Sequence, residues 1–411
     1  MKKSLLICIL LMSLSLCFAN VYKLTDLVNH AIQNSSTMRK SNTNLENVKD
    51  SHSQYLFDIL PNATYNASYN HPSSIDYYSS FNIGKSISLN EPVYFNIRRS
   101  SLDKKIAELN HQNQMKKVAY DVLNAYIDII QTQKNIEISQ KNIDLQRRIY
   151  NQVMIQFQND RKTIYDIQQS QVDTLDSYIA LKDLKNSYRK QRENLFFMIN
   201  MEDEGFPLDS YEFEIIEQNA EFEDNLSIQA NQLSLKRSKL SLTQQYLDLF
   251  PNLSLNYNWQ TSTNDNSMPE LFDVDNYKDS YTFSVNLSYP LFNFSDTGFS
   301  YRIAKRNITT DKIDLEDTIN ETKKNLNQTI LDWEMIYQTY SLYEQKHQLT
   351  QANLDIAEER FALGLISSLD LDKARIQYLE SEVQLVNRYY TLIKKQEEIN
   401  YLKSNKLLGL W

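Results

Sequence analysis

Glycine and proline are scarce in this chain of 411 residues, which contains 5 Gly and 7 Pro where average usage would give roughly 29 and 21. No proline lies between 93 and 206 or after 290, and no glycine lies between 93 and 204. Because both residues interrupt helices, these proline-free stretches can form long, unbroken helices. The scarcity of glycine also excludes a Gly-rich phosphate-binding loop and a G-x-S-x-G nucleophile turn.

Cysteine occurs only at the N-terminus. The sequence "MKKSLLICILLMSLSLCFAN" (1–20) combines two lysines with an apolar core and a cleavage point at Ala19, which is typical of a secretory signal peptide. Cys8 and Cys17 both lie inside it, so the mature chain would have no thiol and no disulfide. Acylation of Cys17 is an alternative, although Leu16 rather than a small residue precedes this cysteine.

Long apolar runs and an excess of positive charge are also missing. After the signal peptide no run of about 18 apolar residues occurs, which excludes a membrane-spanning helix. The formal net charge of −9 argues against nucleic acid as a partner. The five histidines show no metal-binding spacing, and His347 is interpreted as a helix-interface residue. We therefore predict no metal, no cofactor and no enzymatic activity.

A column of mostly apolar residues with a seven-residue period runs through each of the two helical stretches. The first column is Val122, Ile129, Ile136, Ile143, Tyr150 and Phe157, and the second is Leu326, Trp333, Tyr340, His347, Leu354 and Phe361. Each member of the second lies 204 residues after its counterpart, so the chain contains two repeats in one register. A sustained seven-residue period predicts coiled-coil packing. The companion column that starts at Val118 is small or polar, which favours helices side by side over a dense bundle.

Shorter stretches ahead of these helices alternate with a period of two. In "PNLSLNYNWQ" (251–260) the odd positions from 253 to 259 are apolar or aromatic, and the even positions are polar. The same pattern recurs around 63–70, 81–90 and 281–289, which predicts four strands with one apolar face. A length of about ten residues with aromatic ends is typical of lipid-facing barrel strands. The side chains expected to face lipid are Tyr65, Tyr69, Phe81, Ile83, Leu255, Tyr257, Trp259, Phe283, Val285 and Leu287.

Four strands are too few to close a barrel, because the smallest membrane barrels have about eight and open edges are not tolerated in lipid. If the apolar faces meet lipid, several copies of the chain must share one barrel, and the protein is an obligate oligomer in an outer membrane. The alternative is a sheet that lies on a soluble core. The helical stretches offer no broad apolar surface for that role.

The apolar pattern breaks in the same way at the far end of each helical stretch. The second half reads "RFALGLISSLDLDKARIQY" (360–378) and the first reads "QFQNDRKTIYDIQQSQVDT" (156–174). At the 204-residue offset, Asp160, Thr163 and Asp166 match Gly364, Ser367 and Asp370. Gly364 is expected to take the left-handed conformation that ends a helix, which Asp tolerates better than most residues. The Ser–Asp and Thr–Asp pairs resemble capping boxes, so each half is predicted to be a helical hairpin.

These features divide the chain into eight segments. They are a signal peptide (1–19), N-terminal helices (20–60), a β-hairpin (61–92), a long helical hairpin with its tip near 158–166 (93–204), an acidic equatorial segment (205–224), a helix (225–250), a second β-hairpin (251–290), and a second long helical hairpin with its tip near 362–370 (291–411). The polar segments 71–79 and 261–280 are expected as loops of the β-hairpins. A strand at Tyr211–Ile215 is one possibility within the acidic segment.

Several motifs resemble those of the TolC-like outer-membrane efflux family. They are the "F-x-x-G-x-x-S-x-x-D" turn (361–370), the strand openings "PNAT" (61–64) and "PNLS" (251–254), the strand exits "EPVYFN" (91–96) and "YPLFNF" (289–294), the link "GFPLD" (205–209) and the ending "LLGLW" (407–411). The likeness covers essentially the whole mature chain. It implies a mixed α/β membrane protein, a homotrimer with a twelve-stranded transmembrane β-barrel and a periplasmic α-barrel of coiled-coil hairpins.

The resemblance also implies a function. Proteins of this family are passive exit ducts of tripartite efflux or type I secretion systems in the outer membrane of Gram-negative-type cells. They dock to a periplasmic adaptor (membrane fusion) protein and an inner-membrane pump. The main alternative is a secreted or periplasmic coiled-coil structural or adaptor protein without a channel. Adaptors usually need Gly-rich β-domains, for which this chain has too little glycine.

The resemblance makes the tip residues the candidate gate, namely Asp370, Asp372, Asp166, Phe361, Gly364, Ser367, Asp160 and Thr163. Three copies of Asp370 or Asp166 could concentrate negative potential at a constriction and favour cations, while the same residues cap helices. In several relatives a tyrosine and an arginine of the second turn reach an aspartate of the first. Asp166 matches that aspartate, but Phe361 and Ile366 occupy the other two places. Lys373 replaces a second aspartate of some relatives, so the family's closing mechanism does not transfer directly.

Overall fold

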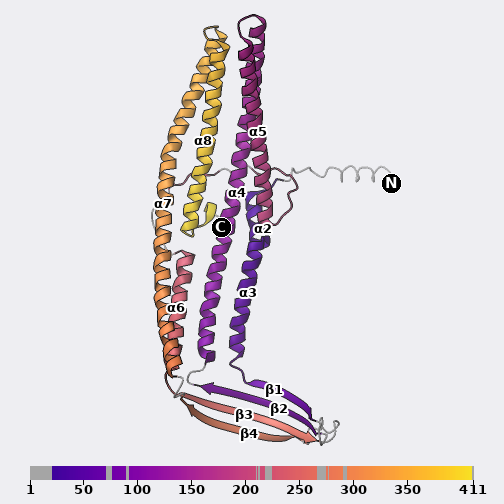
Figure 1. The fold of residues 1–411 in the computed structure, drawn as a ribbon, viewed down its shortest axis with the longest axis vertical. Helices are drawn as coiled ribbons and strands as arrows, with labels where there is room; N and C mark the ends of the chain where they lie inside the picture. Colours follow the sequence, from indigo (N-terminus) through magenta and orange to yellow (C-terminus); the bar gives the residue numbers. More distant parts are fainter. Residues whose placement is uncertain are drawn as a thin grey trace, which may run out of the picture. The chain divides into compact units, whose positions relative to one another are not determined.

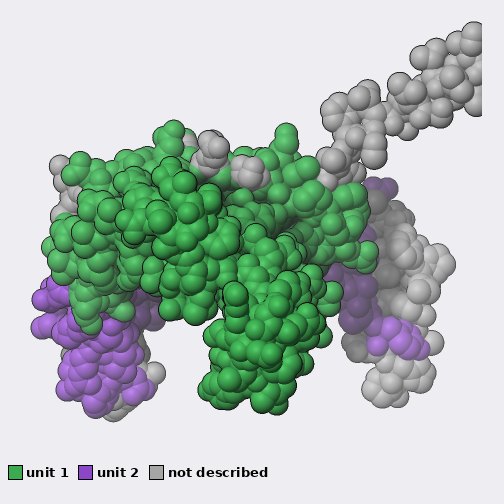
Figure 2. Space-filling view, turned by 90° about the horizontal axis from the view of Figure 1, so that it is seen from above, with its two compact units in different colours: residues 1–41, 113–225, 321–411 green, residues 42–112, 226–320 purple. Residues whose placement is uncertain are grey.

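The computed structural model describes residues 21–70, 76–88, 92–209, 211, 213–217, 225–265, 275, 277–289 and 294–409. The described chain is rich in helix and has one small antiparallel sheet (Figure 1). The predicted signal peptide, with Cys17, lies outside the described residues. The chain divides into two compact units (Figure 2). Unit 1 comprises residues 1–41, 113–225 and 321–411, and unit 2 comprises residues 42–112 and 226–320.

Four long helices form two hairpins. The first hairpin is α4 (Pro92–Gln158) with α5 (Ile164–Ile199), and the second is α7 (Phe294–Ala362) with α8 (Ser368–Leu402). The ends of α4 and α7, and the starts of α5 and α8, lie 204 residues apart, which confirms the register of the repeat. Helix α4 begins at Pro92, inside the predicted strand exit, because the fixed φ of proline suits the first turn of a helix.

Within unit 1 the hairpin helices lie side by side in the order α5, α4, α8, α7 (Figure 1). The contacts that join neighbours include Asn142 to Ser177 (3.3 Å) between α4 and α5, Lys141 to Glu382 (3.0 Å) between α4 and α8, and Lys395 to Asp332 (3.3 Å) between α8 and α7. Helices α5 and α7 are therefore the two outer members of the row.

The two seven-residue columns are buried at their starts and exposed at their ends. Val122 and Leu326, the first members, are 0 % and 1 % exposed. Phe157 and Phe361, the last members, are 38 % and 41 % exposed. The intermediate member His347 lies between α7 and α8, where it stacks on Tyr378 and its Nδ1 lies 3.0 Å from the Ser381 hydroxyl. This position agrees with a helix-interface role for His347.

The main core of unit 1 forms around α2 (Leu24–Asn34), the middle of α4 and the end of α5. It includes Val28, Val122, Tyr126, Leu195, Ile393 and Leu407, the last of these in the short 3-10 helix η3 (Leu407–Gly409). The Tyr126 hydroxyl donates to the Asp209 carbonyl, and burial raises the pKa of Tyr126 to about 12. The buried Arg192 guanidinium donates to both carboxylate oxygens of Asp203, at 2.8 and 2.5 Å. These bonds fasten the link around 203–209 to the hairpin.

The acidic segment after this link forms no strand in its described part. Gln396 of α8 satisfies its backbone instead: the side-chain oxygen accepts from the Ile216 N–H at 2.8 Å, and the side-chain nitrogen donates to the Glu214 carbonyl at 3.0 Å. The Tyr389 hydroxyl donates to the Phe213 carbonyl at 2.8 Å. The strand considered at Tyr211–Ile215 is therefore wrong, because side chains rather than a second strand complete its hydrogen bonds.

Unit 2 contains the sheet. Its strands are β1 (Asn62–Asn70), β2 (Asp76–Ser88), β3 (Asn252–Asp265) and β4 (Lys278–Ser288), paired antiparallel in the order β1-β2-β3-β4. The helices α3 (Ser36–Phe57) and α6 (Leu226–Leu247) precede β1 and β3. Strands β2, β3 and β4 extend into the segments predicted as loops, 71–79 and 261–280. Polar residues there still form the backbone hydrogen bonds of the sheet, as in the pairs Asn70–Asp76 and Tyr78–Asn264.

Candidate functional site

The two hairpin turns of unit 1 have the same backbone. Asp160 and Gly364 both take positive φ, of 54° and 69°. In each turn the next residue donates its N–H to the carbonyl five residues earlier at 2.9 Å, from Arg161 to Gln156 and from Leu365 to Arg360. These bonds are the Schellman ending of a helix, so the expectation that Asp160 takes the conformation of the glycine is confirmed.

Each turn is followed by a complete capping box. The Thr163 hydroxyl accepts from the Asp166 N–H at 3.3 Å, and the Asp166 carboxylate accepts from the Thr163 N–H at 2.8 Å. Ser367 and Asp370 make the same exchange at 3.2 and 3.4 Å. The capping roles predicted for these four residues are therefore confirmed.

The two tip aspartates differ in the hydrogen-bond partner of their second carboxylate oxygen. Asp166 Oδ1 accepts from Lys162 Nζ at 3.1 Å, in an ion pair one helical turn apart. In the described part of the chain no hydrogen bond reaches Asp370 Oδ1. Hydrogen bonds from Thr163 hold the pKa of Asp166 below its ordinary value, and those from Ser367 do the same for Asp370. Both carboxylates are therefore charged at neutral pH, but only Asp370 keeps an oxygen available for a cation.

Asp372 lies in a different environment, although it is only two residues further along α8. It is 2 % exposed, and its Oδ1 lies 3.4 Å from Nη1 of Arg375, which also pairs with Glu358 of α7 at 3.0 Å. Its Oδ2 has no hydrogen-bond partner among the described residues. Burial raises the pKa of Asp372, and the charges of Arg375 and Arg148 oppose this shift. The structure thus places Asp372 inside the row of helices and Asp370 on its surface.

Sequence reasoning missed the apolar character of the tips. Leu363, Leu365 and Leu369 are exposed around the second turn, and Ile164 and Tyr165 are exposed after the first. The sequence "ALGLISSLD" (362–370), in which leucines surround the glycine, carries the signal for this apolar surface. Phe361 is also exposed, whereas Ile366 is half-buried.

The sheet in unit 2 presents an apolar face that nothing in the described chain covers. The strand register places Ile87, Leu255 and Val285 opposite one another, and Ile83, Trp259 and Tyr281 likewise. Phe283 is 70 % exposed and Leu287 is 73 % exposed. Of the other predicted lipid-facing residues, Tyr65, Tyr69, Leu255, Tyr257 and Val285 are exposed, and Phe81, Ile83 and Trp259 are half-buried beside one another.

Lys85 lies on the same face and was not recognised from the sequence. It stands opposite Tyr257 in the register, and its ammonium donates to the Asp58 carbonyl at 2.6 Å. Strict alternation from Phe81 through Ile83 to Ile87 implied this position. The charge is directed away from the centre of the face, toward the residues that follow α3, as long basic side chains near membrane interfaces do.

The opposite face of the sheet is polar. It carries serine, threonine, asparagine and glutamine side chains from all four strands, including Asn82, Asn256, Asn258, Gln260 and Ser284. Gly84 belongs to this face, and a Cβ at this position would lie 2.9 Å from the Asn258 side-chain oxygen. Glycine at this position therefore leaves room for the Asn258 side chain on the polar face.

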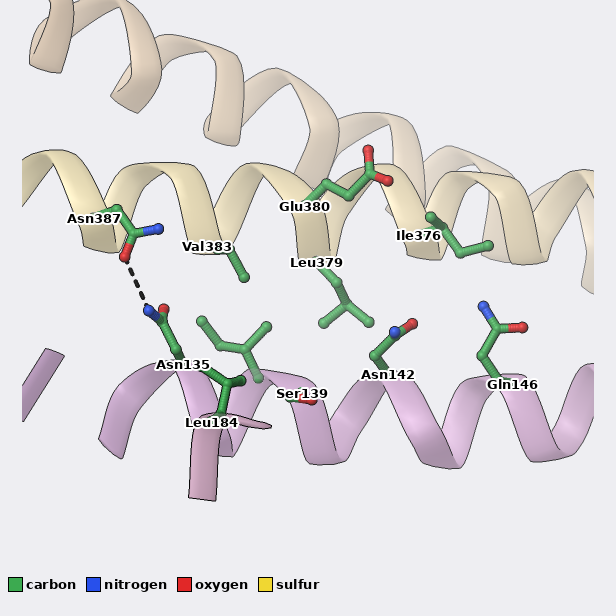
Figure 3. Close-up of a pocket in the computed structure, with 11 residues that line it drawn as sticks. Asn135, Ser139, Asn142, Gln146, Leu184, Ile376, Leu379, Glu380, Val383 and Asn387 are labelled. Carbon is green, nitrogen blue, oxygen red and sulfur yellow. Dashed lines mark hydrogen bonds between the residues drawn. The ribbon is translucent and has the colours of Figure 1, made fainter. Parts of the chain in front are cut away.

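A cavity of about 510 Å³ lies on the seam between α4 and α8 (Figure 3). Ile138 of α4 and Leu184 of α5 face Ile376, Leu379 and Val383 of α8 across it. The amides of Asn135 and Asn387 close one end with a hydrogen bond of 2.9 Å. No group of three or more potential metal-binding side chains occurs in the part of the chain that the structure describes, and no helix there is long and apolar enough to cross a membrane.

Comparison with known proteins agrees with this geometry. Residues 219–402 match the sequence model of the family described as "Outer membrane efflux protein". The resemblance to the TolC-like outer-membrane efflux family is confirmed. The matched residues lie in the second repeat and include the second hairpin turn with its capping box. No curated protein sequence gives a significant match.

Solved outer-membrane channels share the fold over nearly the whole chain. The Campylobacter jejuni channel CmeC has a TM-score of 0.77 at 16 % identity, with 94 % of this chain and 85 % of that chain covered. The open-state channel MtrE of Neisseria gonorrhoeae has 0.77 at 15 %, with 94 % and 89 % covered. VceC of Vibrio cholerae has 0.74 at 14 %, with 94 % and 96 % covered. The fold is therefore that of these outer-membrane channels, and the sequence of residues 219–402 is similar to that of the outer-membrane efflux family.

Proposed function

We propose that this TolC-like chain forms a homotrimer that serves as a passive exit duct. Three four-stranded sheets would join into one twelve-stranded barrel in the outer membrane, and the helical hairpins would join into a twelve-helix tunnel in the periplasm. The observation that carries the proposal is the sheet of unit 2, which is open at both edges and has an uncovered apolar face.

The open edges require further strands. In the described sheet β1 pairs only with β2, and β4 pairs only with β3, so each edge has unpaired backbone groups. In hydrocarbon every such group costs several kcal/mol, so a lipid-embedded sheet must close on itself. Joining β4 of one copy to β1 of the next satisfies both edges. Three copies supply twelve strands, which is within the range of known membrane barrels.

The dimensions of the apolar face suit a bilayer. Apolar or aromatic residues continue along β3 from Leu253 to Trp259 and along β4 from Tyr281 to Leu287. At about 3.3 Å per residue each stretch is ~20 Å long, close to the ~25 Å apolar band of outer-membrane barrels. The polar face would then line a water-filled passage, in which asparagine and serine contact solvent without a desolvation cost.

The tips would provide docking and gating. The exposed leucines around Gly364 offer an apolar surface for a periplasmic adaptor, and an inner-membrane pump would supply the energy. Three copies of Asp370, each with one oxygen free of intrachain hydrogen bonds among the described residues, would favour cations at the opening.

Fractionation and conductance test the proposal. The purified protein should require detergent, have the native mass of a trimer and conduct ions in planar bilayers. A water-soluble monomer without conductance would instead support the coiled-coil structural or adaptor protein. Docking has its own test, because single cysteines at Leu363 or Leu365 should cross-link to the adaptor protein, whereas a cysteine at Thr282 should not.

A further inference from the structure

Unit 2 exposes apolar residues where its helices meet the sheet (Figure 1). Phe57 is the last residue of α3, and Leu60 lies between α3 and β1; both side chains are exposed. Phe250, between α6 and β3, is exposed as well. Leu60 and Phe250 hold the same place in the matching sequences "DILPN" (58–62) and "DLFPN" (248–252), so the feature occurs once in each half of the chain.

The beginnings of α4 and α7 carry exposed apolar residues at the same junction. Tyr94 lies in the first turn of α4, and Phe299 and Ile303 lie in the second and third turns of α7. Together with Phe57, Leu60 and Phe250 these residues form a set that we name the collar. Exposed apolar sets of this kind mark contact with a protein or a membrane.

The collar adjoins the apolar face of the sheet. Lys85 lies on that face, and its ammonium donates to the Asp58 carbonyl at 2.6 Å, in the segment that follows α3. Contacts also join the neighbouring helices in the order α3, α4, α6, α7. They link His52 to Ser100 (2.8 Å), Arg99 to Gln244 (2.8 Å), and the rings of Tyr246 and Tyr301 (6.3 Å between centroids). The helix ends and the apolar face therefore form one continuous surface.

An arginine lies over an aromatic ring of the collar on each of the two long helices. The Arg98 guanidinium carbon lies 5.0 Å from the centroid of the Tyr94 ring, one turn earlier on α4. The Arg302 guanidinium carbon lies 4.4 Å from the centroid of the Phe299 ring, three residues earlier on α7. The two arginines are 204 residues apart and so hold one position of the repeat. Stacking on an earlier residue turns both guanidinium groups toward the sheet.

Both arginines have their charge available to a partner from outside the chain. Arg98 and Arg302 are exposed, and no carboxylate of the described residues forms an ion pair with either of them. Asp296, the acidic residue in the first turn of α7, precedes Arg302 by six residues and so lies about 120° away around the helix axis. A guanidinium group of this kind binds a phosphate through two parallel hydrogen bonds.

The position of these groups along the helices matches the polar layer of a bilayer. Outside the hydrocarbon core each headgroup layer is about 5–8 Å thick. Tyr94 and Phe299, the rings beneath the arginines, lie about 3 and 8 Å from the starts of α4 and α7 at 1.5 Å per residue. With the apolar face of the sheet in hydrocarbon, both guanidinium groups would lie in the headgroup layer on the side of the helices.

We propose that Arg98 and Arg302 bind the phosphate groups of acidic glycerophospholipids in the leaflet next to the helices. The collar contacts the adjoining part of the acyl chains and excludes water from it. The proposal rests on the proposed function and adds a lipid partner to the duct. The apolar surroundings favour a lipid over a soluble phosphate, because a soluble phosphate gains nothing from Phe57, Leu60 and Phe250.

Lipid binding to the purified trimer tests the proposal. The probes are phosphatidylglycerol and phosphatidylcholine, added in detergent, and native mass spectrometry counts the lipids retained per trimer. The native trimer should retain phosphatidylglycerol in preference to phosphatidylcholine. Arg98→Gln/Arg302→Gln should lower the affinity for phosphatidylglycerol about fivefold for each arginine lost. Arg98→Lys/Arg302→Lys keeps the charge but not the paired hydrogen bonds, so its affinity should lie between the other two.

The matched control is Lys105→Gln/Lys312→Gln. Both lysines are exposed on the same two helices, 7 and 10 residues beyond the arginines and thus about 10 and 15 Å further from the sheet. The same loss of charge there should leave the binding of phosphatidylglycerol unchanged. Inorganic phosphate should not displace the lipid.

Three results would overturn the headgroup sites. They are equal losses in the arginine and lysine variants, displacement of the lipid by inorganic phosphate, and a native trimer without preference for phosphatidylglycerol. If the glutamine variant of the arginines also lost its trimer in that last case, the two residues would be subunit contacts instead. A native trimer that still conducts ions would leave the duct intact in all of these cases, whereas a native mass of one chain would overturn the duct itself.

Discussion

Replacing Val285 by lysine should block assembly in the membrane. Val285 lies in the middle of the apolar part of β4, opposite Leu255, with Phe283 and Leu287 two residues away on either side. It is 56 % exposed in the chain, so in the proposed barrel roughly half of its side chain is buried only by lipid. A lysine here would place its ammonium near the bilayer midplane, far from either interface.

The cost follows from two contributions. A lysine at the midplane of a barrel costs about 2–4 kcal/mol, and loss of the half-buried valine surface adds about 1 kcal/mol. The sum is ~3–5 kcal/mol per copy and ~9–15 kcal/mol per trimer. This is comparable to the whole stability of many folded proteins, so the trimer should form at a small fraction of its normal yield.

Thr282→Lys is the matched control for Val285→Lys. Thr282 lies on the same strand, is also exposed, and points to the polar face opposite Asn258. The assay is the yield of heat-dissociable trimer in the outer-membrane fraction of cells that express each variant. Equal yields for the two variants would refute the assignment of the apolar face to lipid.

Four further predictions concern the tips. Ser367→Ala or Thr163→Ala should destabilise the local helix by about 0.5–2 kcal/mol, seen as faster hydrogen exchange in the first turn of α8 or α5. The pKa of Asp370 in the folded chain lies below its ordinary value. Its capping contribution to stability is therefore complete above the unfolded pKa and is lost as the pH falls through the folded pKa. Acid should increase proteolysis at the tip, and the increase should be smaller in Asp370→Asn. For Asp372 the pKa shift has the opposite sign. Its pKa in the folded chain lies above the unfolded value, so its charged form destabilises the fold near neutral pH. Asp372→Asn should therefore keep or raise the melting temperature at pH 7. Asp370→Asn should weaken block by multivalent cations more than Asp166→Asn does, because Lys162 already binds the second oxygen of Asp166.

The features that could be predicted from the sequence are those set by a few neighbouring residues. Gly364 and Asp160 mark a helix end through their backbone preference, and the serine or threonine three residues before an aspartate marks the next start. Alternation in "LSLNYNW" fixes which side chains share a face of β3. Each of these signals acts within about ten residues, so no knowledge of the tertiary fold is needed.

The features that could not be predicted depend on contacts between distant residues. Whether Asp372 is a surface carboxylate or a buried one depends on how α7 and α8 pack, and its sequence neighbour Asp370 gives no indication. The backbone at 213–216 depends on Gln396, which is about 180 residues away and acts in place of a strand. The length of the strands depends on ladder pairs between polar residues, which carry no periodic signal.

Burial of an apolar helix face is a third kind of property, because it depends on which helices lie beside that face. Ile138 and Leu342 occupy the same position of the repeat and have the same chemistry, yet one is buried and the other exposed. The difference lies only in the neighbours, since α4 lies between two helices and α7 is an outer helix. A seven-residue period of apolar residues therefore predicts that a helix face is covered, but it does not identify the chain that covers it. In a row of repeats the uncovered faces of the two outer helices correspond to the two sides of the buried inner seam. They are therefore complementary to each other, which is the condition for a closed ring.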